Sequence, residues 1–500
     1  MRNAAVLLGS QPITWSLTLA FMVVVPRLVG AAEWGEWAIG WSVSLIARAA
    51  LDFGINTVLL KEIAKDRGRA EEYVGAALAA KLLLAAPLVL AVFGFSFLAG
   101  YSPHTRLILA IIAVTTAVSF IGTPTVLALQ ALEKMHVNAI GSILTNAVVT
   151  VLAVLLVKFA AADMVSVSIV NFGAVLLGTS LQWVWLGRSI RIRPAFRWNL
   201  MRSLLVDGLP YWASALFLTV YVFVDGVMIS IFCSPQEVGW YGVATQIIAT
   251  LGFLPYAVTT AVFPALSHSF RNEREEMAVL AGRSFRFLMT MGIPASVGLG
   301  LVADSLVLSI YGTPFAPAEP VLTLLAVSLL PVFAATLVNG FLIATDRQVQ
   351  WTWVMGILCV ANPLINVFTI RYFHGTQGNG ALGAAVALVA TDIVTGAAAL
   401  WLLPAELRAA IMGAIPPMLR SAAAAALMAV VVWPLRYEFV AVPVLAGIVT
   451  FILAALVLKV FPAQEVAVLM AAPRRLLGRP GLSPGRSGAP EQPIPLEVTG

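Results

Sequence analysis

Residues 33–54, EWGEWAIGWSVSLIARAALDFG, decide the fold, because this apolar, helix-length stretch begins with two glutamates and carries two further charges near its end. From Trp37 to Ala47 the stretch has no charged residue. Arg48 and Asp52 then follow four residues apart, so a helix places both on one face. Charges at membrane depth are costly and normally face a cavity or one another. The two residues are therefore either a mutually neutralising structural pair or part of a polar cavity.

The apolar pattern of this stretch recurs along most of the 500 residues. Hydrophobic residues make up 60% of the chain and charged residues 11%, with a mean hydropathy of +0.94. Soluble domains are nearer a quarter charged. Repeated stretches of about 20 apolar residues predict an all-α polytopic membrane protein. About 14 transmembrane helices are expected, roughly at residues 6–29, 35–60, 74–99, 106–130, 137–159, 164–187, 203–232, 238–268, 281–303, 319–345, 350–372, 380–403, 415–436 and 440–461.

The cationic residues predict the orientation of these helices. With the N-terminus in the cytoplasm, 23 of the 30 Lys and Arg residues fall on the cytoplasmic side, five fall outside, and Arg48 and Lys81 remain in the membrane. By the positive-inside rule, both termini are expected to be cytoplasmic. The pI near 9.5 is then a sign of topology and not of nucleic-acid binding. The acids expected near the outer surface, Glu33, Glu36 and Glu237, are interpreted as solvated charges.

The remaining composition excludes several kinds of site. The two cysteines and four scattered histidines show no metal-ligand spacing, so no metal site is expected apart from the sodium site considered below. Residues 463–500 are rich in Pro, Gly and Arg and are expected to form a disordered cytoplasmic tail.

The chain contains an internal repeat. Residues 237–258, EVGWYGVATQIIATLGFLPYAV, repeat the E-x-G-x-aromatic pattern of residues 33–54 at an offset of 204. Short matches also arise by chance in chains rich in Ala, Val and Leu, but the same offset relates the first expected helix to the seventh. Transporters built from parallel repeats rock two lobes about a central site. The repeat thus predicts two pseudo-symmetric six-helix lobes around a central cavity, at residues 1–202 and 203–404, followed by two additional helices at 405–462.

Several longer motifs resemble the polysaccharide and oligosaccharide flippases of the multidrug/oligosaccharidyl-lipid/polysaccharide (MOP) superfamily. PRLVGAAEWGEWAI and LDFGINTVLLKEIA resemble that family's opening signature. VDGVMISIFCSPQEVGWYGVATQI and NPLINVFTIRYFHGTQGNGALGAAVALVATD resemble its later helices, although the HGTQGNG connection is longer than usual. The resemblance spans roughly residues 6–460.

This resemblance implies a flippase that moves a polyprenyl-diphosphate-linked oligosaccharide across a bacterial inner membrane by alternating access, for polysaccharide biosynthesis and export. It also implies membrane lipid, a polysaccharide polymerase and export machinery as partners, and no cofactor.

The first half carries the cations that such a substrate needs. A guanidinium binds phosphate through two parallel hydrogen bonds, so Arg48 suits a diphosphate head group. Lys81 either joins this arrangement or extends to the inner interface. Arg27, near the outer end of the first helix, either meets the head group or anchors that helix. The candidate substrate-binding residues are Arg27, Arg48, Asp52, Asn56 and Lys81.

The second half offers oxygen-bearing side chains instead. Carboxylate, amide and hydroxyl oxygens suit a hard cation such as sodium, and the resemblance implies that the seventh, eleventh and twelfth helices hold a coupling ion. Two alternatives remain: Asp225 or Asp392 binds a proton, or the polar groups only hold helices together. The candidate coupling residues are Asp225, Asn362, Asn366, Thr391 and Asp392.

Three other functions fit parts of the sequence. A multidrug exporter of the same superfamily usually has an acid in its first helix, and residues 6–29 contain none. A flippase for the peptidoglycan precursor fits the helix number, but the repeat motif is nearer the polysaccharide branch. A membrane glycosyltransferase or polymerase needs a sizeable external loop or an acidic pair, and the external connections, about 4 to 16 residues long, contain no D-x-D. The chain is therefore not expected to be an enzyme.

Overall fold

The computed structural model describes residues 2–191, 193–272 and 274–460. The regular structure in these residues is entirely helical. Among them, 12 helices are long and apolar enough to cross a membrane, the bent pair α2–α3 makes a thirteenth span if it is counted as one, and α17 is a shorter apolar helix. The polytopic all-α fold and the number of apolar segments are thus confirmed. The expected tail at 463–500 lies outside the described residues.

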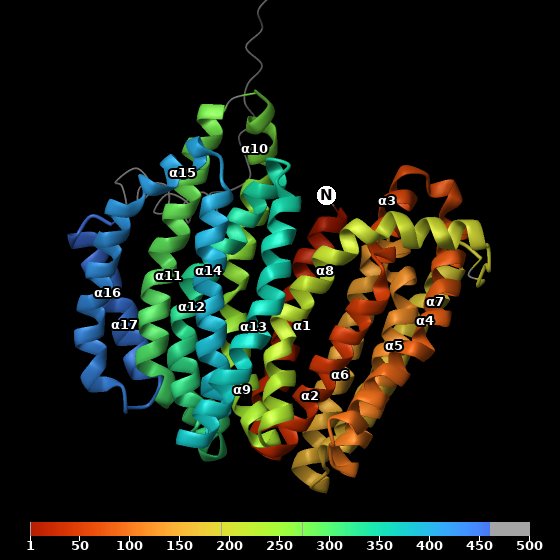
Figure 1. Ribbon diagram of the computed structural model, residues 1–500, viewed down its shortest axis with the longest axis horizontal. Helices are drawn as coiled ribbons and strands as arrows, with labels where there is room; N and C mark the ends of the chain where they lie inside the picture. Colours follow the sequence, from red (N-terminus) through yellow and green to blue (C-terminus); the bar gives the residue numbers. More distant parts are fainter. Residues whose placement is uncertain (1, 192, 273, 461–500) are drawn as a thin grey trace, which may run out of the picture.

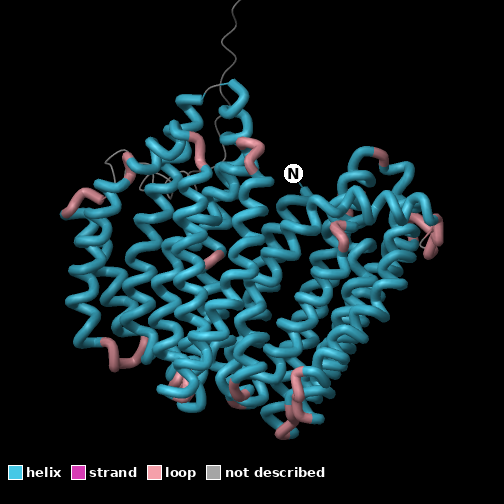
Figure 2. The backbone as a smooth tube through the Cα atoms, viewed as in Figure 1, coloured by secondary structure: helices cyan, strands magenta, loops and turns pink. Residues whose placement is uncertain are grey.

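Most loops lie at the two ends of the helix bundle (Figure 2). The first half of the chain forms α1 (Arg2–Val29), α2 (Ala31–Asp52), α3 (Ile55–Lys65), the 3₁₀ turn η1 (Arg67–Arg69), α4 (Ala70–Leu98), α5 (Pro103–Ala131), α6 (Met135–Ala160) and α7 (Met164–Gly187). It is followed by α8 (Trp198–Phe232), α9 (Pro235–Leu251), α10 (Phe253–Asn272), α11 (Arg274–Tyr311), η2 (Thr313–Phe315), α12 (Ala318–Ala344), α13 (Gln348–Gln377), α14 (Gly380–Leu402), α15 (Ala405–Met412), α16 (Ile415–Leu435) and α17 (Ala441–Val457).

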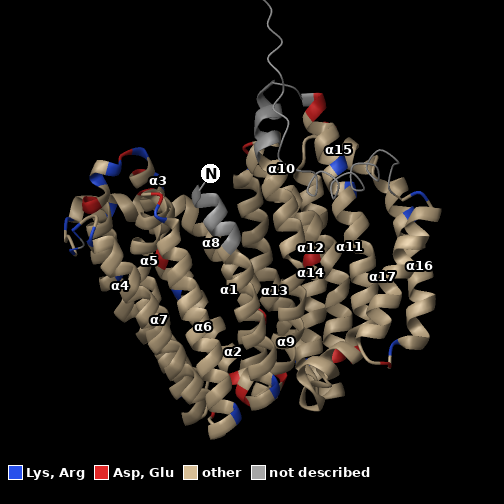
Figure 3. Cartoon of the chain, turned by 180° about the vertical axis from the view of Figure 1, so that it is seen from behind, with Lys and Arg blue, Asp and Glu red and all other residues tan. Residues whose placement is uncertain are grey.

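The helices form two groups that meet along α2, α8 and α9 (Figure 1). We call α1–α7 the first helix group and α8–α14 the second, and α15–α17 pack beside α11. The two groups are close where α2 and α9 begin, which we call the crossing end, and diverge toward the other end (Figure 1). Lys and Arg gather at that other end, around α3, η1 and α15, and we call it the basic end (Figure 3).

Two glycines let α2 and α9 cross in backbone contact. A Cβ atom at Gly35 would overlap the carbonyl oxygen of Pro235, and a Cβ atom at Gly239 would overlap that of Ala31. Gly35 and Gly239 are 204 residues apart in the chain, and so are their partners Ala31 and Pro235. Because 204 is the offset of the repeat, the two halves make the same contact with one another twice. Any larger side chain at either glycine would force the two helix groups apart at the crossing end.

The single helix expected at residues 35–60 is wrong, because the chain bends there by 53° between α2 and α3. Phe53 and Gly54 adopt left-handed backbone conformations, with φ of 46° and 71°. The backbone of Gly54 meets that of Gly208 in α8, and neither position has room for a Cβ atom. The break therefore depends on a contact with a distant part of the chain as well as on the local sequence.

Trp212 of α8 contacts the end of α2 at this break. Its indole N–H donates to the carbonyl oxygens of Ala49 and Ala50, at 3.0 and 3.1 Å. Its ring stacks on Phe53, with the ring centroids 5.5 Å apart. Carbonyls at a helix end lack helical partners, and within a membrane they must find others inside the protein. Trp212 supplies such a partner to Ala49 and Ala50 and so stabilises the break.

The helix expected at residues 238–268 is also interrupted, at Gly252 between α9 and α10. Pro255 follows three residues later and has no N–H to donate to the carbonyl of Leu251. The missing hydrogen bond weakens the helix at this point.

Candidate functional site

Four of the five residues expected to bind substrate lie together in the first helix group. The Lys81 ammonium donates to Asp52 Oδ1 and Asn56 Oδ1, each at 2.8 Å. Asn56 Nδ2 donates to the same Asp52 oxygen at 2.9 Å. Lys81 is fully buried, at 0% exposure, and its ammonium lies 4.1 Å from the centre of the Phe120 ring. We call Arg48, Asp52, Asn56 and Lys81 the cationic cluster.

Arg48 carries the charge that this cluster leaves uncompensated. Its guanidinium donates to the Thr123 hydroxyl at 3.2 Å, and no carboxylate of the described residues forms an ion pair with it. The Arg48–Asp52 pair considered from the sequence is therefore not formed, because Asp52 pairs with Lys81. A fully buried ammonium needs a carboxylate more than a half-buried guanidinium does, since it has lost more hydration. Complete burial also excludes the interfacial position considered for Lys81.

Arg27, the fifth candidate, is far from this cluster. It lies at the crossing end, where its guanidinium donates to the carbonyl oxygens of Ser309 and Ile310 at 2.7 and 3.3 Å. These carbonyls end α11 and carry the negative end of its dipole. Arg27 thus links α1 to α11, and so the first helix group to the second.

All five coupling candidates lie together in the second helix group. Asp225 in α8 is fully buried, accepting from the Tyr241 hydroxyl at 2.5 Å and from Asn366 Nδ2 at 2.7 Å. Asn366 Nδ2 also donates to Asn362 Oδ1 at 2.8 Å, and Asn362 Nδ2 donates to Thr391 at 3.3 Å. These contacts join α8, α9, α13 and α14.

The same network continues to a second carboxylate. The Tyr221 hydroxyl donates to Asp392 Oδ1 at 2.7 Å and lies 3.2 Å from Thr391 Oγ1. Asp392 is 4% exposed. We call Asp225, Asn362, Asn366, Thr391 and Asp392, with Tyr221 and Tyr241, the oxygen cluster.

The oxygen cluster has the chemistry of a site for a cation or a proton. No Lys, Arg or His of the described residues forms an ion pair with Asp225 or Asp392, and buried carboxylates without counter-charge are strongly disfavoured. In addition, Asn366 Oδ1 is buried without a hydrogen-bond partner. Carboxylate, amide and hydroxyl oxygens from several helices are suitable ligands for a hard cation.

Sequence reasoning missed the two tyrosines of this cluster. Tyr221 precedes Asp225 by four residues, one helical turn, and Tyr241 belongs to the repeat motif that begins at Glu237. The four-residue spacing could have predicted that Tyr221 shares a helix face with Asp225. Nothing in the sequence pairs Tyr241 with Asp225, because the two residues meet only through the packing of α8 on α9.

The interpretation of Glu237 as a solvated charge is wrong. Glu237 is 3% exposed, and its Oε2 accepts from the N–H of Gly380, the first residue of α14, at 2.6 Å. Glu33, its equivalent in the repeat, accepts from the N–H of Met164, the first residue of α7, at 2.9 Å. Helix N-termini have free N–H groups and a positive dipole end, so both glutamates are held there as caps.

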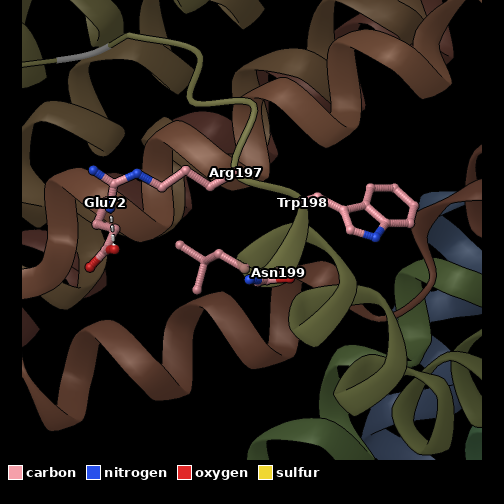
Figure 4. A pocket seen from close by; sticks show the side chains of 5 residues that line it. Glu72, Arg197, Trp198 and Asn199 are labelled. Atoms are coloured by element: carbon pink, nitrogen blue, oxygen red, sulfur yellow. Dashed lines mark hydrogen bonds and ion pairs between the residues drawn. The ribbon is translucent and has the colours of Figure 1, made fainter.

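Surface hollows at the basic end lie away from both clusters. One, of about 570 Å³, is lined by the starts of α4 and α8, where Arg197 pairs with Glu72 while Trp198 points away from this pair (Figure 4). A neighbouring hollow, of about 350 Å³, is lined in part by Arg69, Arg191, Arg193 and Arg197. Such basic surfaces suit anionic lipid head groups.

The profile of a family described as polysaccharide biosynthesis proteins matches residues 1–270, more than half of the chain. The chain belongs to this family. Over 168 residues it is 28% identical to the probable low-salt glycan biosynthesis flippase Agl15 of Haloferax volcanii, a match that covers 33% of this chain and 34% of that protein. The match thus spans about a third of the relative's length.

Several solved structures share the fold of this polysaccharide biosynthesis family member. The lipid II flippase MurJ in an inward closed conformation matches with a TM-score of 0.72 and 14% identity, over 91% of this chain and 97% of MurJ. An inward-facing multidrug resistance MATE family transporter matches with a TM-score of 0.63 and 14% identity, over 80% of this chain and 96% of that one. A MOP superfamily transporter from Pyrococcus furiosus matches with a TM-score of 0.53 and 12% identity, over 82% of this chain and 93% of that transporter. These relatives are flippases and transporters, not enzymes.

Proposed function

We propose that the protein is a flippase that moves a polyprenyl-diphosphate-linked oligosaccharide from the cytoplasmic to the outer leaflet by alternating access. Membership of the polysaccharide biosynthesis family and the similarity to a glycan flippase support a lipid-linked glycan as substrate. The fold supports two helix groups that move relative to one another.

The observation that carries this proposal is the uncompensated charge of Arg48. Lys81 and Asp52 neutralise one another, so the cationic cluster keeps one net positive charge at membrane depth. An uncompensated cation there is costly, and an anionic ligand would remove the cost. Because a guanidinium binds phosphate oxygens in pairs, a diphosphate next to Arg48 is the proposed complex, with Asn56 offering further polar contacts.

The distribution of charge supports a direction of transport. Lys and Arg gather at the basic end (Figure 3), which the positive-inside rule assigns to the cytoplasm. Both ends of the described chain lie on that side, so we propose cytoplasmic termini and a place in the bacterial inner membrane. The two groups diverge toward the basic end (Figure 1), and this conformation would therefore receive substrate from the cytoplasmic leaflet.

The oxygen cluster would supply the coupling. A ligand that binds both conformations with equal affinity does not change the equilibrium between them. Coupled transport therefore needs an ion that binds one conformation more tightly than the other. We propose that sodium, or alternatively a proton, binds at Asp225 and its neighbours. The buried carboxylates and the unpartnered Asn366 oxygen support this role.

Transport by an Arg48→Gln variant in proteoliposomes tests the proposal. We expect outward movement of a short polyprenyl-diphosphate oligosaccharide to fall at least about tenfold, since loss of one charge-assisted contact costs about 1.5–3 kcal/mol. Arg371→Gln is the matched control, because Arg371 is an exposed arginine at the crossing end. Equal transport by Arg48→Gln, Arg371→Gln and wild type would contradict the role given to Arg48.

A further inference from the structure

Three side chains of different chemistry meet at the crossing end of the second helix group. Cys233 follows the last residue of α8, Glu237 lies in the first turn of α9, and His374 lies in the last turn of α13. Their sulfur, carboxylate oxygen and ring nitrogen atoms all lie within 4.8 Å of one another. His374 is 137 residues from Glu237 in the chain, so spacing alone gave no sign of this group.

The three groups are close enough to contact one another. Glu237 Oε2 lies 3.1 Å from His374 Nδ1. Gly380 borders the group, and a Cβ atom there would overlap the Cys233 sulfur and lie 3.1 Å from Glu237 Oε2. Only glycine leaves the sulfur and the carboxylate free to approach one another at this position.

We propose that Cys233, Glu237 and His374 bind one borderline divalent metal ion of the Zn²⁺ class, with water completing a tetrahedral set. Thiolate, imidazole and carboxylate are the ligands that zinc takes in proteins, and three protein ligands with one open position are a common arrangement. The side chain of His374 is 46% exposed, which gives the ion a path from solvent. All three residues lie outside the two clusters described above, so this site is independent of the proposed function.

Binding exchanges a proton for the metal. Metal ions bind cysteine as the thiolate, so the Cys233 thiol would give up its proton when the ion binds. The ion displaces this proton to solvent and takes the thiolate as ligand. The bound ion would connect the ends of α8, α9 and α13 beside the start of α14.

A second group of possible metal ligands lies in the first helix group, and the experiment must distinguish it from Cys233, Glu237 and His374. Glu33, Glu36 and His104 also bring ligand atoms within 4.8 Å of one another at the crossing end, in the first helix group. This group has no sulfur, so it cannot produce a thiolate spectrum with any metal. A metal whose absorption reports thiolate coordination therefore separates the two groups.

The test is a titration of the full-length, chelator-stripped protein in detergent with Co²⁺, followed by displacement with Zn²⁺. We expect a sulfur-to-cobalt charge-transfer band that saturates near one equivalent and disappears when zinc is added. Cys233→Ser should abolish the band, and His374→Gln should weaken cobalt binding at least about tenfold. Both variants retain Glu237 and therefore its contacts with the N–H groups of Ser234 and Gly380.

Cys359→Ser and His104→Gln are the matched controls, because each removes the same residue type elsewhere, and both should keep the band. No band in the wild type, or a band that persists in folded Cys233→Ser, would overturn the proposal. Cobalt binding without a thiolate band, lost in His104→Gln, would place the metal in the other group and would also overturn it.

Discussion

At the scale of single residues, Lys81 and Arg48 of the cationic cluster make different contacts. Lys81 is fully buried and donates to Asp52 and Asn56, whereas the Arg48 guanidinium donates to the Thr123 hydroxyl and forms no ion pair with a carboxylate of the described residues. We therefore propose that Lys81 positions the cationic cluster and that Arg48 supplies its uncompensated charge. The two can be separated by measuring stability and transport independently.

Lys81→Met is expected to destabilise the protein strongly, because it leaves Asp52 largely buried without its counter-charge. Breaking a buried pair from one side costs about 3–5 kcal/mol, whereas replacing both partners by apolar groups is often nearly neutral. The double variant Lys81→Met/Asp52→Leu should thus recover most of the loss. Equilibrium unfolding in mixed micelles measures both values. A double variant no more stable than Lys81→Met would show that the pair does not account for the burial of Lys81.

Asp225→Asn tests the oxygen cluster. If sodium binds there, adding sodium in place of choline should stabilise the wild type by about 2.7 kcal/mol at a concentration one hundred times the Kd. The variant should be insensitive to sodium, because it lacks the carboxylate. The measurement is thermal unfolding in detergent under both salts. Sodium stabilisation that is unchanged in Asp225→Asn would exclude the site, and its absence from both proteins would favour the proton.

The candidate residues were predictable to different degrees. Asn362 and Asn366 share a helix face through their four-residue spacing, and charges such as Asp225 and Lys81 are conspicuous in apolar helices. The residues that contact these elements were not predictable from the sequence. Tyr241 meets Asp225, and Trp212 meets the end of α2, only through tertiary packing. The roles of all these residues stay predictions.

At the scale of elements, the break between α2 and α3 is the feature that the sequence conceals. The LDFG motif contains a glycine, but an isolated glycine is tolerated inside a helix at modest cost. What ends α2 is the left-handed pair Phe53–Gly54, held against Gly208. Apolar length predicted the membrane segments well, since each needs about 20 residues whatever its neighbours. The break depends on a neighbour and was therefore missed.

Gly54→Ala should destabilise the protein by more than about 1 kcal/mol, because the left-handed conformation alone costs an L-residue 1–2 kcal/mol and the new Cβ atom would overlap the carbonyl oxygen of Gly208. Gly94→Ala is the control, since Gly94 lies within α4 with nothing within 4 Å of a Cβ atom. It should be neutral or slightly stabilising, as alanine is the better helix former. Equal unfolding midpoints for the two variants would contradict the account of the break.

At the scale of the whole molecule, equivalent positions in the two halves make equivalent contacts. Gly35 and Gly239 each meet a carbonyl of the other helix at the crossing end, and Glu33 and Glu237 each cap the last helix of their own group. The lobes at residues 1–202 and 203–404 stay a prediction, with which these repeated contacts agree. The close contact between the two groups lies at one end of the molecule, as the proposed alternating access would require.

The most direct test of the account is transport by the wild type in proteoliposomes. Outward movement of a short polyprenyl-diphosphate oligosaccharide is compared with that of the same oligosaccharide on a polyprenyl monophosphate and with export of a cationic dye. The account predicts rapid movement of the diphosphate lipid, much slower movement of the monophosphate and no dye export. Dye export without movement of either lipid would contradict it and would make the protein a drug exporter.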